Sequence, residues 1–125
     1  MKLLRAALLA TIVATLMATT VLAVPKDPFK GNWKSIDTDG SRQSLALGGR
    51  ADWRNVNLRD NYATACGGGT AIAKGKGTVS GASLSVTLSV HCANKTPIAD
   101  TPYTFTYDSL TNTLTDSFGV VWSRP

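Results

Sequence analysis

The sequence predicts an all-β protein, a single antiparallel up-and-down barrel of about eight short strands with one disulfide. Short runs of alternating apolar and polar residues are separated by Gly, Asn, Asp and Ser, and no useful length of chain has helical periodicity. These runs recur about every 8–12 residues, which is typical of barrels and sandwiches. All eight acidic residues are Asp and none is Glu, a bias toward turns and away from helices.

The N-terminal segment has the composition of a secretory signal peptide. Lys2 and Arg5 form a short positive region, and residues 6–23 are uncharged and mostly apolar. Val21 and Ala23 supply small residues at the −3 and −1 positions of a cleavage site. We therefore expect a signal peptide over residues 1–23 and a secreted or periplasmic protein.

Cleavage after Ala23 leaves one small domain and no stable membrane span. The remaining chain is long enough for one modest core, with a flexible N-terminal arm over residues 24–30 and the barrel over residues 31–125. Loss of Lys2 and Arg5 lowers the net charge from +5 to +3. The remaining basic residues are scattered and not interleaved with aromatic residues, so nucleic acid is not an expected partner.

The clearest strand covers residues 83–92. Its even positions, from Leu84 to Cys92, are apolar, and its odd positions, from Ser83 to His91, are polar, as in a half-buried antiparallel strand. The other predicted strands are less regular and cover residues 31–37, 42–47, 51–58, 63–69, 71–80, 102–108, 113–116 and 118–124.

Two of these regions predict local irregularity. In residues 51–58, Ala51 and Trp53 share one face whereas Val56 and Leu58 share the other, so we expect a bulge between them. The small, Gly-rich residues 63–80 are expected to form a tightly curved pair of strands near the disulfide.

The two cysteines predict a disulfide, because Cys66 and Cys92 lie in a chain that carries an export signal. A metal site formed by Cys66, His91 and Cys92 is the alternative. Adjacent strand residues point to opposite faces, so His91 and Cys92 hardly converge on one ion, and three ligands do not close a structural site. We expect no metal and no cofactor.

The acidic segment from Asp37 to Ser41 predicts a hairpin turn. An EF-hand loop needs Gly at its sixth position and Glu at its twelfth, whereas counting from Asp37 places Gly40 fourth and Gly48 twelfth. Asp39-Gly40 is instead suited to the positive φ angles of a tight turn. A catalytic carboxylate pair, Asp37 with Asp39, is the alternative. One His, no Glu and no free Cys do not favour an enzyme.

The two ends of the barrel carry aromatic and basic residues that should meet. Closure brings the first and last strands together, so Arg124 is expected to lie across the Trp33 ring in a cation–π contact, next to Trp122. At these positions the chain resembles the lipocalin-like (calycin) barrels, which begin with Gly-x-Trp, as in residues 31–33, and place an Arg near the end of the final strand, as Arg124 does.

The opening is also similar to that of the avidins. There the Gly-x-Trp motif leads to a Gly-Ser turn and an Ile/Leu-rich second strand, compared here with Gly40-Ser41 and Leu45. These resemblances imply an up-and-down barrel with a mouth able to take a small, mostly apolar ligand.

Two functional hypotheses follow for a protein that we expect to be monomeric. In the first, Trp53, Tyr103, Phe105 and Tyr107 line a pocket for a small apolar ligand. In the second, aromatic side chains fill the barrel, because eight strands enclose little more than their own side chains. A filled barrel would act through its surface or loops on an exported protein partner, as a protease inhibitor, an adhesive or an envelope component. The bacterial metalloprotease inhibitors are similarly small, exported, single-disulfide barrels with an active N-terminal arm.

Overall fold

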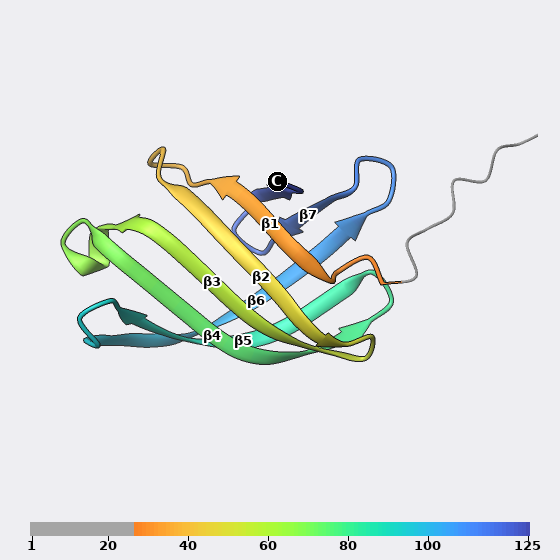
Figure 1. The fold of residues 1–125 in the computed structure, drawn as a ribbon, viewed down its shortest axis with the longest axis horizontal. Coiled ribbons are helices and arrows are strands. Elements are labelled where there is room, and N and C mark those ends of the chain that lie inside the picture. Colours follow the sequence, from red (N-terminus) through yellow and green to blue (C-terminus); the bar gives the residue numbers. More distant parts are fainter. Residues whose placement is uncertain (1–26) are drawn as a thin grey trace, which may run out of the picture.

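The computed structural model describes residues 27–125; the predicted signal peptide and residues 24–26 of the predicted arm lie outside the described residues. Eight antiparallel strands follow one another around a closed barrel, as the sequence predicts (Figure 1). In chain order they are β1 (Gly31–Ile36), β2 (Arg42–Arg50), β3 (Trp53–Ala63), β4 (Gly69–Ser80), β5 (Ser83–Cys92), β6 (Pro97–Asp108), β7 (Thr113–Asp116) and β8 (Val121–Ser123). Within the described part of the chain, no helix is long and apolar enough to span a membrane.

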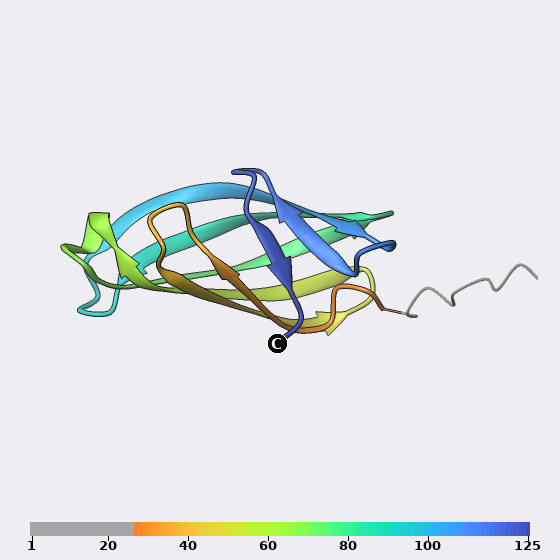
Figure 2. The ribbon, with the colours of Figure 1, turned by 90° about the horizontal axis from the view of Figure 1, so that it is seen from above.

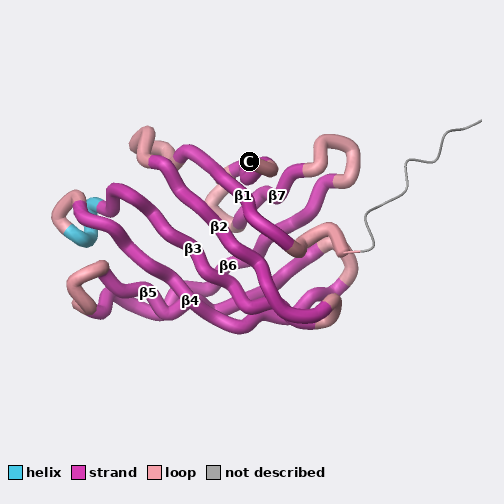
Figure 3. Tube along the Cα trace, in the orientation of Figure 1, coloured by secondary structure: helices cyan, strands magenta, loops and turns pink. Residues whose placement is uncertain are grey.

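The predicted strand bounds hold best where alternation is strongest. Residues 83–92 and 113–116 form β5 and β7 as expected. Residues 63–69 do not form a strand of their own, because β3 continues to Ala63 and a short 3-10 turn, η1 (Thr64–Cys66), leads into β4 (Figure 3). β6 begins at Pro97, five residues before the predicted start.

The predicted bulge within residues 51–58 is wrong. β2 and β3 pair without interruption from Gln43 and Asp60 to Arg50 and Trp53. The irregularity lies instead between β3 and β4, after Asp60. Val56 and Leu58 are buried, and the unbroken alternation brings Arg54 into the interior with them and leaves Trp53 on the outside.

Glycine allows a close approach of β4 to β5. The pairing between these strands is interrupted between Lys74 and Thr78, with the same register on both sides. A Cβ atom at Gly75 would lie 2.5 Å from the Thr87 carbonyl oxygen, and one at Gly77 would lie 2.7 Å from that of Ser85. Contacts this short require glycine, so the Gly-rich sequence of β4 allows its close approach to β5. The expected curved pair of strands over residues 63–80 is not present, because residues 64–66 form η1.

The meander gives the barrel two different ends. The β1–β2, β3–β4, β5–β6 and β7–β8 connections lie at one end, here called the open end, and the other connections lie at the opposite, closed end (Figures 1 and 3). The N-terminal segment covers the closed end, where the Phe29 side chain is only 1% exposed. Phe29 is therefore part of the core.

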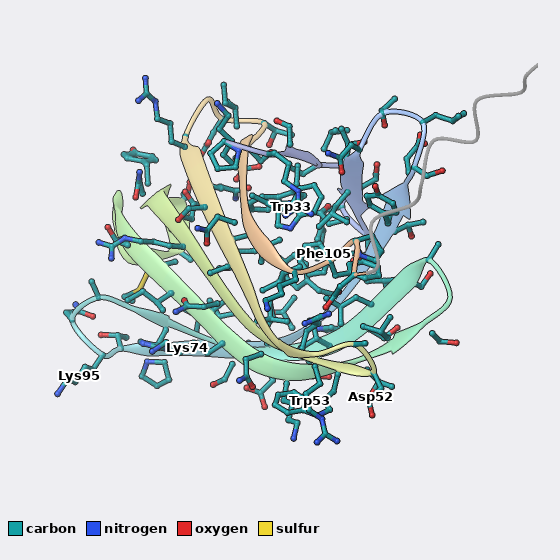
Figure 4. The ribbon with its side chains drawn as sticks, turned by 45° about the vertical axis from the view of Figure 1, so that its right-hand side comes forward. Trp33, Asp52, Trp53, Lys74, Lys95 and Phe105 are labelled. Carbon is teal, nitrogen blue, oxygen red and sulfur yellow. A yellow bond between two sulfur atoms is a disulfide. The ribbon has the colours of Figure 1, made fainter. Side chains whose placement is uncertain are left out.

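Large side chains fill the middle of the barrel. Trp33, Phe105 and Trp122 are each at most 1% exposed, and Figure 4 shows Trp33 and Phe105 inside the barrel. Phe105 packs edge-on against Trp122 with ring centroids 6.3 Å apart. The remaining core residues surround them and include Leu45, Leu47, Val56, Leu58, Ala73, Leu84, Val86, Leu88 and Leu114.

The first and last strands close the barrel. β8 pairs with β1 through Lys34 and Ser123, and Figure 2 shows the C-terminal strand running alongside β1. The Ser35 hydroxyl donates a hydrogen bond to the Val121 carbonyl oxygen at 2.8 Å. Beyond β8, the predicted contact is present: the guanidinium of Arg124 lies 3.7 Å from the centroid of the Trp33 ring.

Cys66 and Cys92 form the predicted disulfide. It joins η1 to the end of β5, so it fixes the β3–β4 connection to the neighbouring hairpin at the open end. Both thiols are consumed in this bond, and neither is available as a thiolate ligand for a metal ion.

Candidate functional site

The open end contains a hollow of about 360 Å³ above the filled core. Side chains from three separate parts of the barrel line it: the β1–β2 turn with the start of β2, the middle of β6, and the β7–β8 turn. They are Asp37, Thr38, Gln43, Tyr103, Asp116, Phe118 and Val120. The hollow thus combines two carboxylates with two aromatic rings and an aliphatic wall.

The aromatic wall continues into the core. The Tyr103 ring lies 4.9 Å from that of Phe118, centroid to centroid, and is stacked at 5.7 Å on that of Phe105. Phe105 is fully buried, whereas Phe118 is exposed at the rim. Tyr103, between them, therefore presents a rigidly supported ring to the hollow.

The carboxylate of Asp116 has a structural role. Its Oδ1 accepts hydrogen bonds from the backbone N–H groups of Phe118 and Val120, at 2.9 and 3.0 Å. Its Oδ2 accepts a hydrogen bond from the indole N–H of Trp122 at 3.0 Å. Asp116 therefore shapes the β7–β8 turn and still places a negative charge beside the hollow.

A third carboxylate, that of Asp60, stands next to the hollow on β3. Its Oδ2 accepts a hydrogen bond of 3.5 Å from the Gln43 side-chain amide, and its Oδ1 accepts one from the Tyr62 N–H. Among the described residues, no three His, Cys, Asp or Glu side chains are grouped as metal ligands. The carboxylates are spread around the hollow rather than gathered at one point.

Electrostatics at the open end act on Tyr103. Burial raises the pKa of its hydroxyl, and the negative charges of Asp116, Asp37 and Asp60 raise it further, because each opposes formation of the tyrosinate. These three carboxylates thus make the hollow a region of negative potential in a chain whose net charge is positive.

Of the four aromatic residues predicted to line a pocket, only Tyr103 and Phe105 lie together. Tyr103 reaches the hollow, and Phe105 supports it from below. Tyr107 lies toward the closed end, 6.2 Å from Phe29, and its hydroxyl donates to Asn112 in the β6–β7 turn. Trp53 is on the outer surface (Figure 4). The Lys76 ammonium lies 4.0 Å from the centroid of its ring.

The other residues predicted to have a structural role, Trp33, Trp122 and Arg124, lie where the first and last strands meet and in the core. The indole N–H of Trp33 donates to the Phe29 carbonyl oxygen, and Trp122 is buried against Phe105. Arg124 donates hydrogen bonds of 2.7 Å to the carbonyl oxygens of Pro28 and Lys30. Trp33 and Arg124 thus hold residues 28–30 on the closed end, opposite the hollow.

The acidic segment is the hairpin that the sequence predicts. The Asp37 N–H donates to the Ser41 carbonyl oxygen, and Gly40 has a φ of +85°. Asp39 is exposed, and hydrogen bonds from Ser41 lower the pKa of its carboxyl. Only Asp37 of the supposed catalytic pair lines the hollow, so the two carboxylates do not form a shared site there.

Sequence reasoning missed Gln43, Asp60, Asp116 and Phe118 as residues of the open end. Alternation was the available signal: Asp60 has the parity of the buried Leu58, and Gln43 has that of Leu45. Asp116 shares the parity of Leu114.

Comparison with known proteins gives no further assignment. No protein-family model matches the chain, and no curated protein or solved structure is significantly similar to it. The eight-stranded antiparallel barrel itself fits a calycin-like fold.

Proposed function

We propose that the protein is an exported binding module that takes a small, mostly apolar ligand with a positive charge at the open end of the barrel. The observation that carries this proposal is the hollow of about 360 Å³, in which the Tyr103 and Phe118 rings face a region surrounded by Asp37, Asp60 and Asp116. Its size is near the lower end of small-molecule sites, roughly 300–1,000 Å³.

The chemistry of the hollow supports an organic cation. Aromatic faces attract cations through their quadrupole, and carboxylates add a direct attraction. An alkyl- or arylammonium group needs no fixed set of ligands, so it suits carboxylates that are spread around a cavity. Because Trp33, Phe105 and Trp122 fill the barrel below, the ligand is limited to about one ring or a short chain.

Export and a calycin-like relationship belong to the same proposal. The predicted signal peptide supports export, as does a disulfide, which persists in oxidising compartments. The Gly-x-Trp motif with Arg124 lying on Trp33 supports a lipocalin-like barrel. Biotin binding is not part of the proposal, because the aromatic residues that line the hollow are Tyr103 and Phe118 rather than a row of tryptophans.

Titration with three probes of matched shape tests the proposal. Phenethylamine, 2-phenylethanol and 3-phenylpropionate are added to the ¹⁵N-labelled exported protein, and amide chemical shifts are followed. We expect saturable shifts around Tyr103, Asp116 and Phe118 with phenethylamine, weaker ones with the neutral alcohol and none with the carboxylate. Equal shifts with all three probes, or none with any, would contradict the proposal.

Paired substitutions test the source of selectivity. Asp37→Asn with Asp60→Asn removes two charges that act on Tyr103, whereas Asp39→Asn with Asp52→Asn removes two exposed charges that neither line the hollow nor act on Tyr103. Only the first pair should abolish the preference for the amine over the alcohol. If both pairs act alike, the preference reflects net charge and not the hollow.

A further inference from the structure

Five basic side chains that are dispersed in the sequence lie on one outer face of the barrel. Each is exposed and belongs to one of the four consecutive strands β1 to β4: Lys34, Arg42, Arg59, Lys74 and Lys76. The register of the strands places these basic residues beside one another across neighbouring strands. Ser44 pairs with both Lys34 and Arg59, and Asn57 pairs with Lys74.

No acidic side chain balances this face. Asp60 is the only acidic residue in β1 to β4, and its carboxylate is hydrogen-bonded to Gln43 at the open end. In residues 27–125, none of the five basic side chains forms an ion pair; the ion pairs are Arg50 with Asp52 and Arg54 with Asp27. The face therefore has a concentrated positive charge that can attract a polyanion.

The same face is hollowed and lined with amides. Two adjoining hollows of about 360 and 410 Å³ share Asn57 and Lys74. The first also contains Asn32, Ser44 and Arg59, and the second contains Asn55 and Lys76. Figure 4 shows Lys74 on the outside of the barrel. Together the hollows cross all four strands, with hydrogen-bonding groups between the charges.

We propose that this outer face of β1 to β4, the basic face, binds an anionic polysaccharide. The basic residues pair with sulfate, phosphate or carboxylate groups of the polymer, and the amides of Asn32, Asn55 and Asn57 hydrogen-bond to its hydroxyl groups. An amide can donate and accept at once, which matches the hydroxyl group of a sugar. This site is separate from the hollow at the open end and does not depend on it.

Other polyanions fit the face less well. Single-stranded nucleic acids are bound by basic grooves with free aromatic rings on which bases stack. Of the aromatic rings in β1 to β4 that are at least partly exposed, that of Trp53 is covered by Lys76 and that of Tyr62 lies outside both hollows. A membrane surface is also bound by inserted apolar groups. The large exposed apolar side chains are outside the two hollows: Ile36, Tyr62, Ile98, Leu110, Phe118 and Val121.

Binding of dextran sulfate and of neutral dextran of equal length to the exported full domain tests the proposal at an ionic strength of ~0.15 M. Polygalacturonate serves as a carboxylated polymer, and an oligothymidylate and vesicles with anionic lipid serve as other polyanions. We expect dextran sulfate or polygalacturonate to bind, with an affinity that falls as salt rises, and neutral dextran not to bind. Failure of both acidic polysaccharides to bind would overturn the proposal, and so would tighter binding of the oligonucleotide or the vesicles.

Two double variants of equal net charge test whether the polymer binds at the basic face. Arg59→Gln with Lys74→Gln removes two charges of the basic face, and Lys30→Gln with Lys95→Gln removes two exposed charges outside both hollows. We expect the first to weaken binding about thirtyfold. Each basic group near an anionic surface contributes a similar free energy to binding, and this variant loses two of them. The second should change binding by less than about threefold. Equal losses would show that only net charge matters and would overturn the proposal. Unchanged circular dichroism verifies that both variants fold.

Discussion

The guanidinium of Arg124 lies 3.7 Å from the centroid of the Trp33 ring and binds the carbonyl oxygens of Pro28 and Lys30 at 2.7 Å. One side chain near the C-terminus thus covers the ring of the first strand and fixes the segment before it. Removal of that ring should open the closed end, because Phe29 and Arg124 both depend on Trp33.

Trp33→Ala should lower the free energy of unfolding by about 3–5 kcal/mol, the usual cost of emptying a buried aromatic position. Urea unfolding followed by circular dichroism measures the change. Trp53→Ala is the matched control, because its ring lies on the outer surface under Lys76, and it should cost about 1 kcal/mol or less. A similar loss of unfolding free energy in the two variants would mean that Trp33 does not stabilise the closure of the barrel.

The buried Arg54 should make Asp27 important for stability. The side chain of Arg54 is 0% exposed, and Asp27 is its ion-pair partner. Asp27→Asn should cost about 3–5 kcal/mol, since it leaves a charge in the core without its counter-charge. Asp52→Asn breaks the exposed pair with Arg50 and should cost about 1 kcal/mol or less.

A second substitution separates the charge from the packing of the segment. Arg54→Met in the Asp27→Asn background removes the unpaired guanidinium, so it should restore most of the lost stability. If the double variant is no more stable than Asp27→Asn alone, the loss arises from the N-terminal segment itself and not from the buried charge.

Loss of the disulfide should weaken the domain and leave the barrel fold intact. Cys66 and Cys92 are 26 positions apart, and replacing both with Ser should cost about 3.5 kcal/mol in the loop-entropy account. Denaturant unfolding of the variant and of the reduced parent protein, each compared with the oxidised parent protein, measures this cost. The two should agree; a reduced parent as stable as the oxidised protein would contradict the prediction.

Strand order and closure were predictable because they depend on local alternation and short turns. The five even positions of β5 are apolar or Cys. Each strand is followed by a connection short enough to join it to the next strand in an antiparallel meander. The ends could be paired because an antiparallel barrel has only one way to close such a meander. Trp33 and Arg124 were therefore placed correctly although 91 positions separate them.

The orientation of β3 could not be predicted in the same way. A Trp is normally assigned to the core and an Arg to solvent, but Trp53 is outside and Arg54 is inside. The core accepts Arg54 because Asp27, from the segment before the first strand, supplies its counter-charge. The ion pair of Arg54 with Asp27 joins β3 to the segment before β1, so no periodic pattern in the sequence indicates it.

The basic face and the carboxylates beside the hollow were missed for a related reason. Alternation tells on which face a residue lies, but only the register tells which residues are neighbours. Arg59 and Lys34 share the neighbour Ser44, and Tyr103 approaches Asp37 only because the barrel closes. Scattered basic residues therefore gave no indication of a patch.

The raised pKa of Tyr103 predicts a loss of stability at alkaline pH. The hydroxyl ionises above its ordinary value of 10.0 in the folded state, so the unfolded chain loses this proton first as pH rises. The contribution to stability is complete below about pH 10 and disappears as pH rises through the folded value. Tyr103→Phe should remove this part of the alkaline decline, measured by urea unfolding at several pH values.

Asp37→Asn should move the Tyr103 titration, followed by tyrosinate absorbance, toward lower pH, whereas Asp39→Asn should not. An unchanged titration in Asp37→Asn would show that this carboxylate does not act on the hollow.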